Sequence, residues 1–213
     1  AKSLQPIGGQ SMLARIYETV SSITNETSFV VGYEKEAIIK ETKKFVGEIN
    51  ICVQEKPIGT ADAVKAALNN ISSDSQTLIL YGDVPLIKLQ TLKKMLSANE
   101  DSLTILTTEL TDPTGYGRVK KDDAGLALSI VEEKDATSEE KKIKEIFTGV
   151  LCCKKTLLEE AISQVDNHNA AGEYYLTDIV SIISAKGYKI NTCVASNDCL
   201  LYTSPSPRDC RLS

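Results

Sequence analysis

Short apolar runs and stretches of helical period alternate along the first 110 residues. The runs with the length of buried strands span residues 28–33, 50–54, 77–83 and 103–110. Apolar residues at helical spacing follow Ser11, occur in 34–45, begin again near Thr60 and recur from Leu89 to Leu96. Strands separated by helices of this size predict a Rossmann-like α/β fold, with a mixed, mostly parallel sheet flanked by helices.

The pattern changes after residue 111. Residues 117–134 predict two strands around an Asp-Asp-Ala-Gly turn, which would form a small antiparallel β insertion. A strand at 145–155, helices at 156–165 and 176–187, and a last strand at 188–195 complete the predicted elements. We expect one domain over residues 1–198. We interpret 199–213 as a disordered, non-native tail, because it follows no period and its first eleven residues resemble a translated sequencing adaptor.

Charge and cysteine content exclude several classes of protein. The net charge of −5 provides no basic surface for nucleic acid, and no apolar run approaches the roughly 18 residues of a membrane span. The six cysteines form no Cys-x-x-Cys pair and His168 has no partner at metal-binding spacing, which argues against a zinc site. We expect reduced, buried thiols in a cytoplasmic protein, with neither nucleic acid nor membrane as a partner.

The stretch "LILYGDVPL" (78–86) ends an apolar strand with a carboxylate. In parallel α/β sheets, ligands bind outside the carboxyl ends of the strands. Gly82 allows a close approach of the backbone there, and Pro85 prevents continuation of the strand. Asp83 is therefore a candidate Mg²⁺ ligand, because Mg²⁺ bridges one or two carboxylates to substrate phosphates. A turn or cap residue is an equally good interpretation from this motif alone.

Four other stretches are each ambiguous by themselves. "QEKPIGTADAV" (54–64) suits either a base-reading loop or an ordinary loop and N-cap, and "DPTGYGR" (112–118) suits either a sugar-contacting loop or a tight turn. "VEEKDAT" (131–137) places two acids on opposite faces of a strand, so that one of them is available to sugar hydroxyls unless the run is simply solvated. In "GEYYLTD" (172–178), helix capping is the default role of Thr177.

Taken together, in this order and spacing, the five stretches closely resemble the nucleotidyltransferase domain of bacterial N-acetylglucosamine-1-phosphate uridyltransferases. The resemblance runs from Lys2 to about Val194. It implies a fold of the nucleotide-diphospho-sugar transferase type and transfer of UMP from UTP to N-acetylglucosamine-1-phosphate, with Mg²⁺ as cofactor. It also implies a role in cell-wall precursor synthesis and a longer parent protein. That parent would carry an acetyltransferase β-helix domain and would trimerise through it.

The resemblance assigns roles to particular residues. Asp83 matches the Mg²⁺-binding aspartate, and Lys2 matches a lysine that reaches the phosphates. The implied substrate-binding residues are Gln54, Gly59 and Thr60 for uracil, Tyr81 and Gly82 for the sugar nucleotide, Gly117 and Glu132 for the sugar, and Thr177 for a further substrate contact.

The chain departs from the family pattern at three places. The family's first strand and Gly-rich phosphate loop would precede residue 1, so we expect these 213 residues alone to be inactive and poorly stable. Phe147 stands where the family usually has an asparagine that binds the N-acetylglucosamine. The second metal ligand, an asparagine, would fall in the tail and is not assigned. The rival interpretations are a related glucose nucleotidyltransferase that uses UTP or dTTP, and a non-catalytic nucleotide-sugar-binding homologue.

Overall fold

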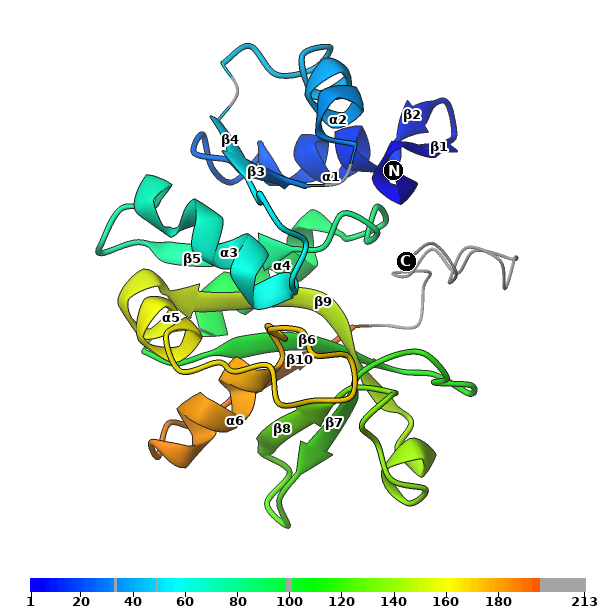
Figure 1. The fold of residues 1–213 in the computed structure, drawn as a ribbon, viewed down its shortest axis with the longest axis vertical. Coiled ribbons are helices and arrows are strands. Elements are labelled where there is room, and N and C mark those ends of the chain that lie inside the picture. The colour runs from blue at the N-terminus through cyan, green and yellow to red at the C-terminus, as the bar shows by residue number, and fades with distance from the viewer. Residues whose placement is uncertain (33, 49, 99–100, 196–213) are drawn as a thin grey trace.

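A six-stranded mixed sheet forms the body of the protein (Figure 1). The computed structural model describes residues 1–32, 34–48, 50–98 and 101–195. Five strands follow the spatial order β10-β6-β9-β7-β8, and β5 pairs with β9 beside this path. The strands are β5 (Gln76–Leu80), β6 (Thr104–Glu109), β7 (Arg118–Lys121), β8 (Ala127–Val131), β9 (Glu145–Lys154) and β10 (Asn191–Val194).

Helices cover both faces of this sheet. On one face, α3 (Thr60–Ala67), α5 (Lys155–Ile162) and α6 (Asp178–Ala185) contribute to the larger of two clusters of buried apolar side chains. On the other, α1 (Met12–Val20) and α4 (Leu89–Ala98) share the second cluster with β6 and β10. Helix α1 begins as predicted, because the Ser11 hydroxyl accepts the Ala14 N–H at 3.3 Å. The α/β class and the layered arrangement are confirmed.

The sheet is less parallel than the sequence predicts. Strand β10 is parallel to β6, but β9 is antiparallel to β5, β6 and β7. Eight consecutive residues of β9, Ile146 to Cys153, are buried, which reflects coverage of both faces of the strand. Such a continuous apolar run shows that a strand is central but not in which direction it pairs. The antiparallel pairing of β9 is therefore what makes the sheet mixed and less parallel than we expected.

The β7–β8 hairpin matches the predicted antiparallel insertion. Its turn is held by Asp122, whose carboxylate accepts the N–H groups of Ala124 and Leu126, and Gly125 adopts φ +81°. Strand β7 also pairs with β9 at Arg118 and Ile146. The hairpin therefore extends the main sheet and is not a separate layer.

The predicted chemistry of the cysteines is confirmed where the structure describes it. Cys52, Cys152, Cys153 and Cys193 are buried free thiols. Burial raises the pKa of Cys153 to about 12, so this thiol is inert near neutral pH. No helix in the described ranges has both the length and the apolarity needed to cross a bilayer. The predicted tail at 199–213 lies outside the described residues.

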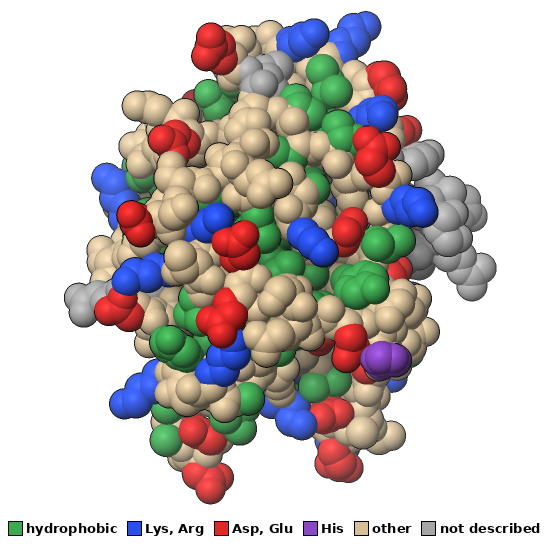
Figure 2. Space-filling model, turned by 60° about the vertical axis from the view of Figure 1, so that its left-hand side comes forward, with side chains coloured by type: hydrophobic (Ala, Val, Ile, Leu, Met, Phe, Trp, Pro, Cys, Tyr) green, Lys and Arg blue, Asp and Glu red, His purple; other side chains and the backbone are tan. Residues whose placement is uncertain are grey.

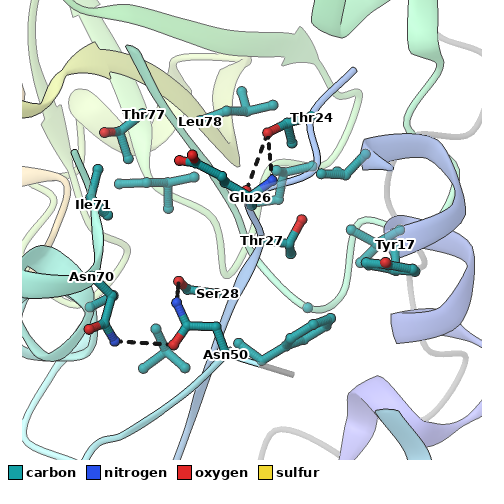
Figure 3. Close-up of a pocket in the computed structure, with 18 of the residues that line it drawn as sticks. Tyr17, Thr24, Glu26, Thr27, Ser28, Asn50, Asn70, Ile71, Thr77 and Leu78 are labelled. Atoms are coloured by element: carbon teal, nitrogen blue, oxygen red, sulfur yellow. Dashed lines mark hydrogen bonds between the residues drawn. The ribbon is translucent and has the colours of Figure 1, made fainter. Parts of the chain in front are cut away.

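Strands β3 (Ser28–Val31) and β4 (Asn50–Val53) form a separate parallel pair, which lies with α1 and α2 (Lys35–Thr42) at one end of the molecule (Figure 1). A cavity of about 870 Å³ lies between β3 and β5. Figure 3 shows Leu78 and Thr77 of β5 on one side of this cavity and Ser28 and Asn50 on the other. Its walls combine strand side chains from two unjoined sheets, which is the lining expected of a position for another strand. The first strand implied by the resemblance stays a prediction.

Stability measurements test whether the packing beside this cavity is weaker than the packing in the core. Leu106 and Leu78 both pack in the second apolar cluster, but Leu106 is fully buried and Leu78 lines the cavity. We expect Leu106→Ala to lower the free energy of unfolding by about 3 kcal/mol and Leu78→Ala by about 1 kcal/mol, because the second change enlarges an existing space. Urea denaturation of the two variants and the wild type measures this difference. Equal losses would show that Leu78 is as well packed as the core.

Candidate active site

Tyr81, Gly82 and Asp83 directly follow the end of β5, and the Asp83 carboxylate lies at the rim of the sheet. The short helix η1 (Lys2–Leu4) lies against this rim, and Lys2 Nζ is 3.1 Å from Asp83 Oδ2. Both side chains are more than 40% exposed. A Cβ at position 82 would lie 3.2 Å from Ser3 Cβ, so glycine permits this close approach. The structure thus brings the two predicted catalytic residues together, although they are 81 positions apart.

Tyr81 occupies the middle of the site. Its backbone N–H donates to the Gly149 carbonyl at 2.9 Å, and its ring lies 6.0 Å from the Phe147 ring in an edge-to-face arrangement. Burial raises the pKa of the Tyr81 phenol, although a hydrogen bond with the Thr60 hydroxyl opposes the shift. The charges of Glu132 and Asp83 also raise this pKa, which places both carboxylates near the phenol.

Gln54 and Gly59 lie together beyond the end of β4. The Gln54 amide donates to the Gly59 carbonyl at 2.9 Å and to the Asp62 carboxylate at 3.0 Å. Gly59 has φ +137°, and a Cβ there would meet the Tyr174 backbone at 2.3 Å. Only glycine fits this position, because the loop before α3 lies directly against the chain around Tyr174.

Two backbone hydrogen bonds and one side chain join that loop to the segment before α6. The Tyr174 N–H donates to the Ile58 carbonyl, and the Ala61 N–H donates to the Tyr174 carbonyl, both at 2.9 Å. The Thr60 hydroxyl accepts the Leu176 N–H at 2.8 Å. Thr60 is the first residue of α3, and Gly59 occupies the N-cap position. The Thr60 side chain does not cap the helix and instead connects Tyr81 to the segment before α6.

Glu132, Thr177 and Gly117 form the third part of the site. The Thr177 hydroxyl donates to the Glu132 carboxylate at 2.8 Å. A Cβ at Gly117 would lie 3.5 Å from the Glu132 carboxyl group and 2.7 Å from Ile130. Thr177 does occupy the N-cap position of α6, but its side chain makes no capping hydrogen bond, so the default capping role is wrong. Burial raises the pKa of Glu132, and the Thr177 hydrogen bond partly offsets this shift.

A cavity of about 400 Å³ opens beside Glu132, and four acidic side chains are among those that line it. Asp135, Asp178 and Tyr175 line it together with His168. Burial raises the pKa of Asp178 to about 6, and the neighbouring carboxylates of Asp166, Glu132 and Asp135 add to the shift. The pKa of Tyr175 is raised to about 12, first by burial and then by the same acidic surroundings.

The donor set at the rim fits only a shared metal site. Within the described parts of the chain, no three His, Cys, Asp or Glu side chains are arranged to hold a metal ion. The protein alone therefore does not complete a metal site around Asp83 within these residues. Mg²⁺ commonly binds in this way, because it retains water and completes its shell with substrate phosphate oxygens.

Positive and negative side chains are mixed on the face of the molecule drawn in Figure 2. That face has no concentration of charge that would compete with the rim for charged ligands. Local groups at the site therefore determine which ligands it binds, more than the acidic total charge does.

Sequence reasoning missed three residues that shape the site. Gly149 has φ +83°, and a Cβ there would meet the Tyr81 ring at 2.6 Å. A glycine inside an apolar strand run was the available signal, since it often marks a bulge or a close approach. The Tyr174 backbone and the Asp62 carboxylate hold the loop around Gly59, but nothing in the local sequence indicated either contact.

A mixed α/β sheet with polar side chains at its strand ends is typical of an α/β protein that binds a ligand at that edge of the sheet. The chain belongs to the Nucleotidyl transferase family, whose sequence profile matches residues 1–198. A solved structure from Bacillus anthracis, assigned as a glucose-1-phosphate thymidylyltransferase in complex with sucrose, has a similar fold. Its TM-score is 0.74 at 17% identity, and the match covers 92% of this chain and 78% of the other.

Curated relatives named Bifunctional protein GlmU are similar in sequence. The protein from Dechloromonas aromatica is 39% identical over 191 residues, which are 90% of this chain and 42% of the relative. The protein from Neisseria meningitidis serogroup C (strain 053442) is 40% identical over 190 residues, which are 89% of this chain and 41% of the relative. The chain thus spans about two fifths of the length of these relatives.

The raised pKa of Asp178 predicts a particular dependence of stability on pH. Its folded pKa of about 6 lies above the unfolded value of about 3.9, so the folded state binds this proton more tightly. Relative to Asp178→Asn, the wild type should lose stability as the pH rises from about 4 to about 7, as the carboxylate becomes charged in its buried setting. Urea denaturation across this range measures the difference.

The matched control for this experiment is Asp123→Asn, which changes an exposed carboxylate in the β7–β8 turn. This control should follow the pH profile of the wild type. Parallel profiles for Asp178→Asn and the wild type would contradict the origin that we assign to the shift.

Proposed function

We propose that the protein transfers UMP from UTP to N-acetylglucosamine-1-phosphate, which yields UDP-N-acetylglucosamine and pyrophosphate. The observation that carries this proposal is the position of Asp83 at the end of β5, beside Lys2 and adjoining Tyr81. The Tyr81 phenol in turn connects to Thr60 and lies near Glu132. The sequence motifs and the identity of about 40% to proteins named GlmU support this substrate pair over others.

In the proposed reaction, a phosphate oxygen of the sugar phosphate attacks the α-phosphorus of UTP. The bond to the bridging oxygen breaks, and pyrophosphate leaves with that electron pair. No protein nucleophile is needed, so the residues act by positioning and by charge stabilisation. Lys2 neutralises phosphate charge, and Asp83 would hold Mg²⁺ against the phosphates. The bound ion would offset the negative charge that these groups carry.

The remaining residues orient the two substrates. Gln54 and the backbone at Gly59-Thr60 would read the uracil edge, because an amide offers both a donor and an acceptor. Tyr81-Gly82 would contact the sugar nucleotide, and Gly117, Glu132 and Thr177 would contact the sugar. The Thr177 hydrogen bond fixes the Glu132 carboxylate in one orientation, which favours specific recognition of hydroxyl groups.

The proposal extends to the longer protein of which this chain would be a part. Its first strand and phosphate loop would precede residue 1, and an acetyltransferase β-helix domain would follow and form a homotrimer. The protein would act in the cytoplasm, where it would supply precursors for the cell wall and lipopolysaccharide. The 870 Å³ cavity between β3 and β5 is compatible with an added strand.

The variant Asp83→Asn tests the role of the carboxylate. In the protein extended by its flanking coding sequence, we expect pyrophosphate release from UTP and N-acetylglucosamine-1-phosphate to fall by about 100-fold or more, because the metal ligand is lost. Thermal stability should hardly change, since an exposed ion pair contributes at most about 1 kcal/mol. The control Asp123→Asn should retain full activity. Wild-type rates in Asp83→Asn would refute the assignment.

Two rival functions are separated by changing the ligands. A related nucleotidyltransferase would prefer glucose-1-phosphate with UTP or dTTP in the same assay. A non-catalytic binding homologue would bind UDP-N-acetylglucosamine equally well with and without Mg²⁺. We expect calorimetric titration to show tighter binding with Mg²⁺, because Asp83 would hold the ion and the ion would supply positive charge to the diphosphate. Metal-independent binding without turnover would favour the binding module.

A further inference from the structure

Arg118 is the largest fully buried side chain in the described part of the protein. It is the first residue of β7, directly after the loop 112–117, and its side chain is only 2% exposed. One terminal nitrogen donates to the carbonyl of Tyr116, and the other lies 2.6 Å from the Glu133 carboxylate. Its Nε is buried without a hydrogen-bond partner among the described residues. Burying a guanidinium is costly unless the charge is paired, so Glu133 is essential to this arrangement.

Glu133 holds the same loop at a second point. The carboxylate oxygen that pairs with Arg118 also accepts the Gly115 N–H at 3.2 Å. Burial opposes ionisation of Glu133, but the hydrogen bonds from Arg118 and Gly115 outweigh it and hold its pKa below the usual value. Lys141 lies 3.4 Å from the other carboxylate oxygen. The loop is therefore held through one N–H group and, by way of Arg118, one carbonyl.

The neighbouring residue faces the site. Glu132 follows the last residue of β8 and accepts a hydrogen bond from the Thr177 hydroxyl, whereas Glu133 lies in the turn that follows and pairs with Arg118. Gly117, at the end of the held loop, packs against Glu132 and accepts the Phe147 N–H at 2.9 Å. A shift of the loop would therefore move Gly117 relative to Glu132. The sequence predicted only that one of the two acids would be available to sugar hydroxyls. The structure gives each acid a different partner.

We propose that Arg118 and Glu133 are positioning residues, which hold the loop 112–117 so that Gly117 and Glu132 present a fixed surface to the sugar of the sugar-1-phosphate substrate. This inference rests on the proposed function. Neither side chain touches the substrate. Their effect reaches the site through the Gly115 N–H, the Tyr116 carbonyl and the turn of the backbone at Gly117.

A double substitution separates positioning from folding. The variant Arg118→Met/Glu133→Leu removes both charges together, and such replacement of a buried pair by apolar residues often preserves stability. It also removes the contacts to Gly115 and Tyr116. In the extended protein, we expect KM for N-acetylglucosamine-1-phosphate to rise about tenfold or more, with KM for UTP nearly unchanged. The pair Lys155→Met/Glu159→Leu is the control, because it removes a 2.7 Å ion pair on α5, outside the site.

Amide hydrogen exchange on the 213-residue chain provides a readout that needs no catalysis. The amide of Gly115 and its neighbours in 112–117 should exchange faster in the Arg118→Met/Glu133→Leu variant, while the β9 amides keep their protection. Unchanged exchange in the loop overturns the anchoring, whether or not the wild type is active. Faster exchange with both KM values unchanged overturns the effect on the sugar. If the wild type is inactive but the loop exchanges faster in the variant, the proposed function is refuted, and the result still shows that Arg118 and Glu133 hold the loop 112–117.

If the double variant does not fold, the single variant Arg118→Lys takes its place. Lysine keeps the charge but lacks the fork that reaches Glu133 and Tyr116 together. A rise in KM for the sugar phosphate alone supports positioning. An equal loss of affinity for both substrates, in step with lost stability, shows a structural role only and overturns the proposal.

Discussion

The interruption of β9 at Gly149 is the constraint on which the rest of the site depends. The pairing of β6 with β9 shifts register between Ile105 and Thr107, which face Leu151 and Phe147, so β9 carries two extra residues there. Beyond the shift β9 pairs with β5, and before it β9 reaches β7. One strand thus joins the part of the sheet that ends at Asp83 to the part that carries the β7–β8 hairpin. Because Gly149 has no side chain, the Tyr81 ring lies directly on it.

That placement of Tyr81 determines how the other segments meet. Its phenol reaches Thr60, whose hydroxyl also accepts the Leu176 N–H, and so it links β5 to two loops far apart in sequence. The loop at Gly59 lies against Tyr174 with no space for a Cβ, which leaves little freedom for relative movement. Buried backbone groups must find partners, and here these loops supply partners to one another. The site is consequently rigid where we propose that the base and the sugar bind.

The sequence predicted the elements and the grouping of the site residues far better than the way they are connected. Although the strand expected to carry Glu132 and Glu133 ends at Val131, local period and turn residues are enough to place α1 after Ser11 and the strand before Asp83. They do not encode the direction in which β9 pairs, because an apolar run buried on both faces looks the same in a parallel and an antiparallel sheet. The Thr177 hydroxyl illustrates the same limit, since a helix-capping residue and a partner for a distant carboxylate have identical local sequences. The Arg118 pair joins the first residue of β7 to a residue in the turn after β8, so its burial emerged only from the fold.

The two catalytic candidates have different partners from the recognition residues of the site. Lys2 and Asp83 are exposed and bound chiefly to each other, whereas Gln54, Thr60 and Glu132 are held by neighbours. An exposed ion pair is weak, so either partner can exchange the other for a phosphate or a cation at little cost. The Glu132 carboxylate cannot move without breaking its hydrogen bond with Thr177. Its pKa is raised because burial disfavours the charged form. This contrast suits a site in which the recognition groups stay fixed and the charged groups adjust to the phosphates as they arrive.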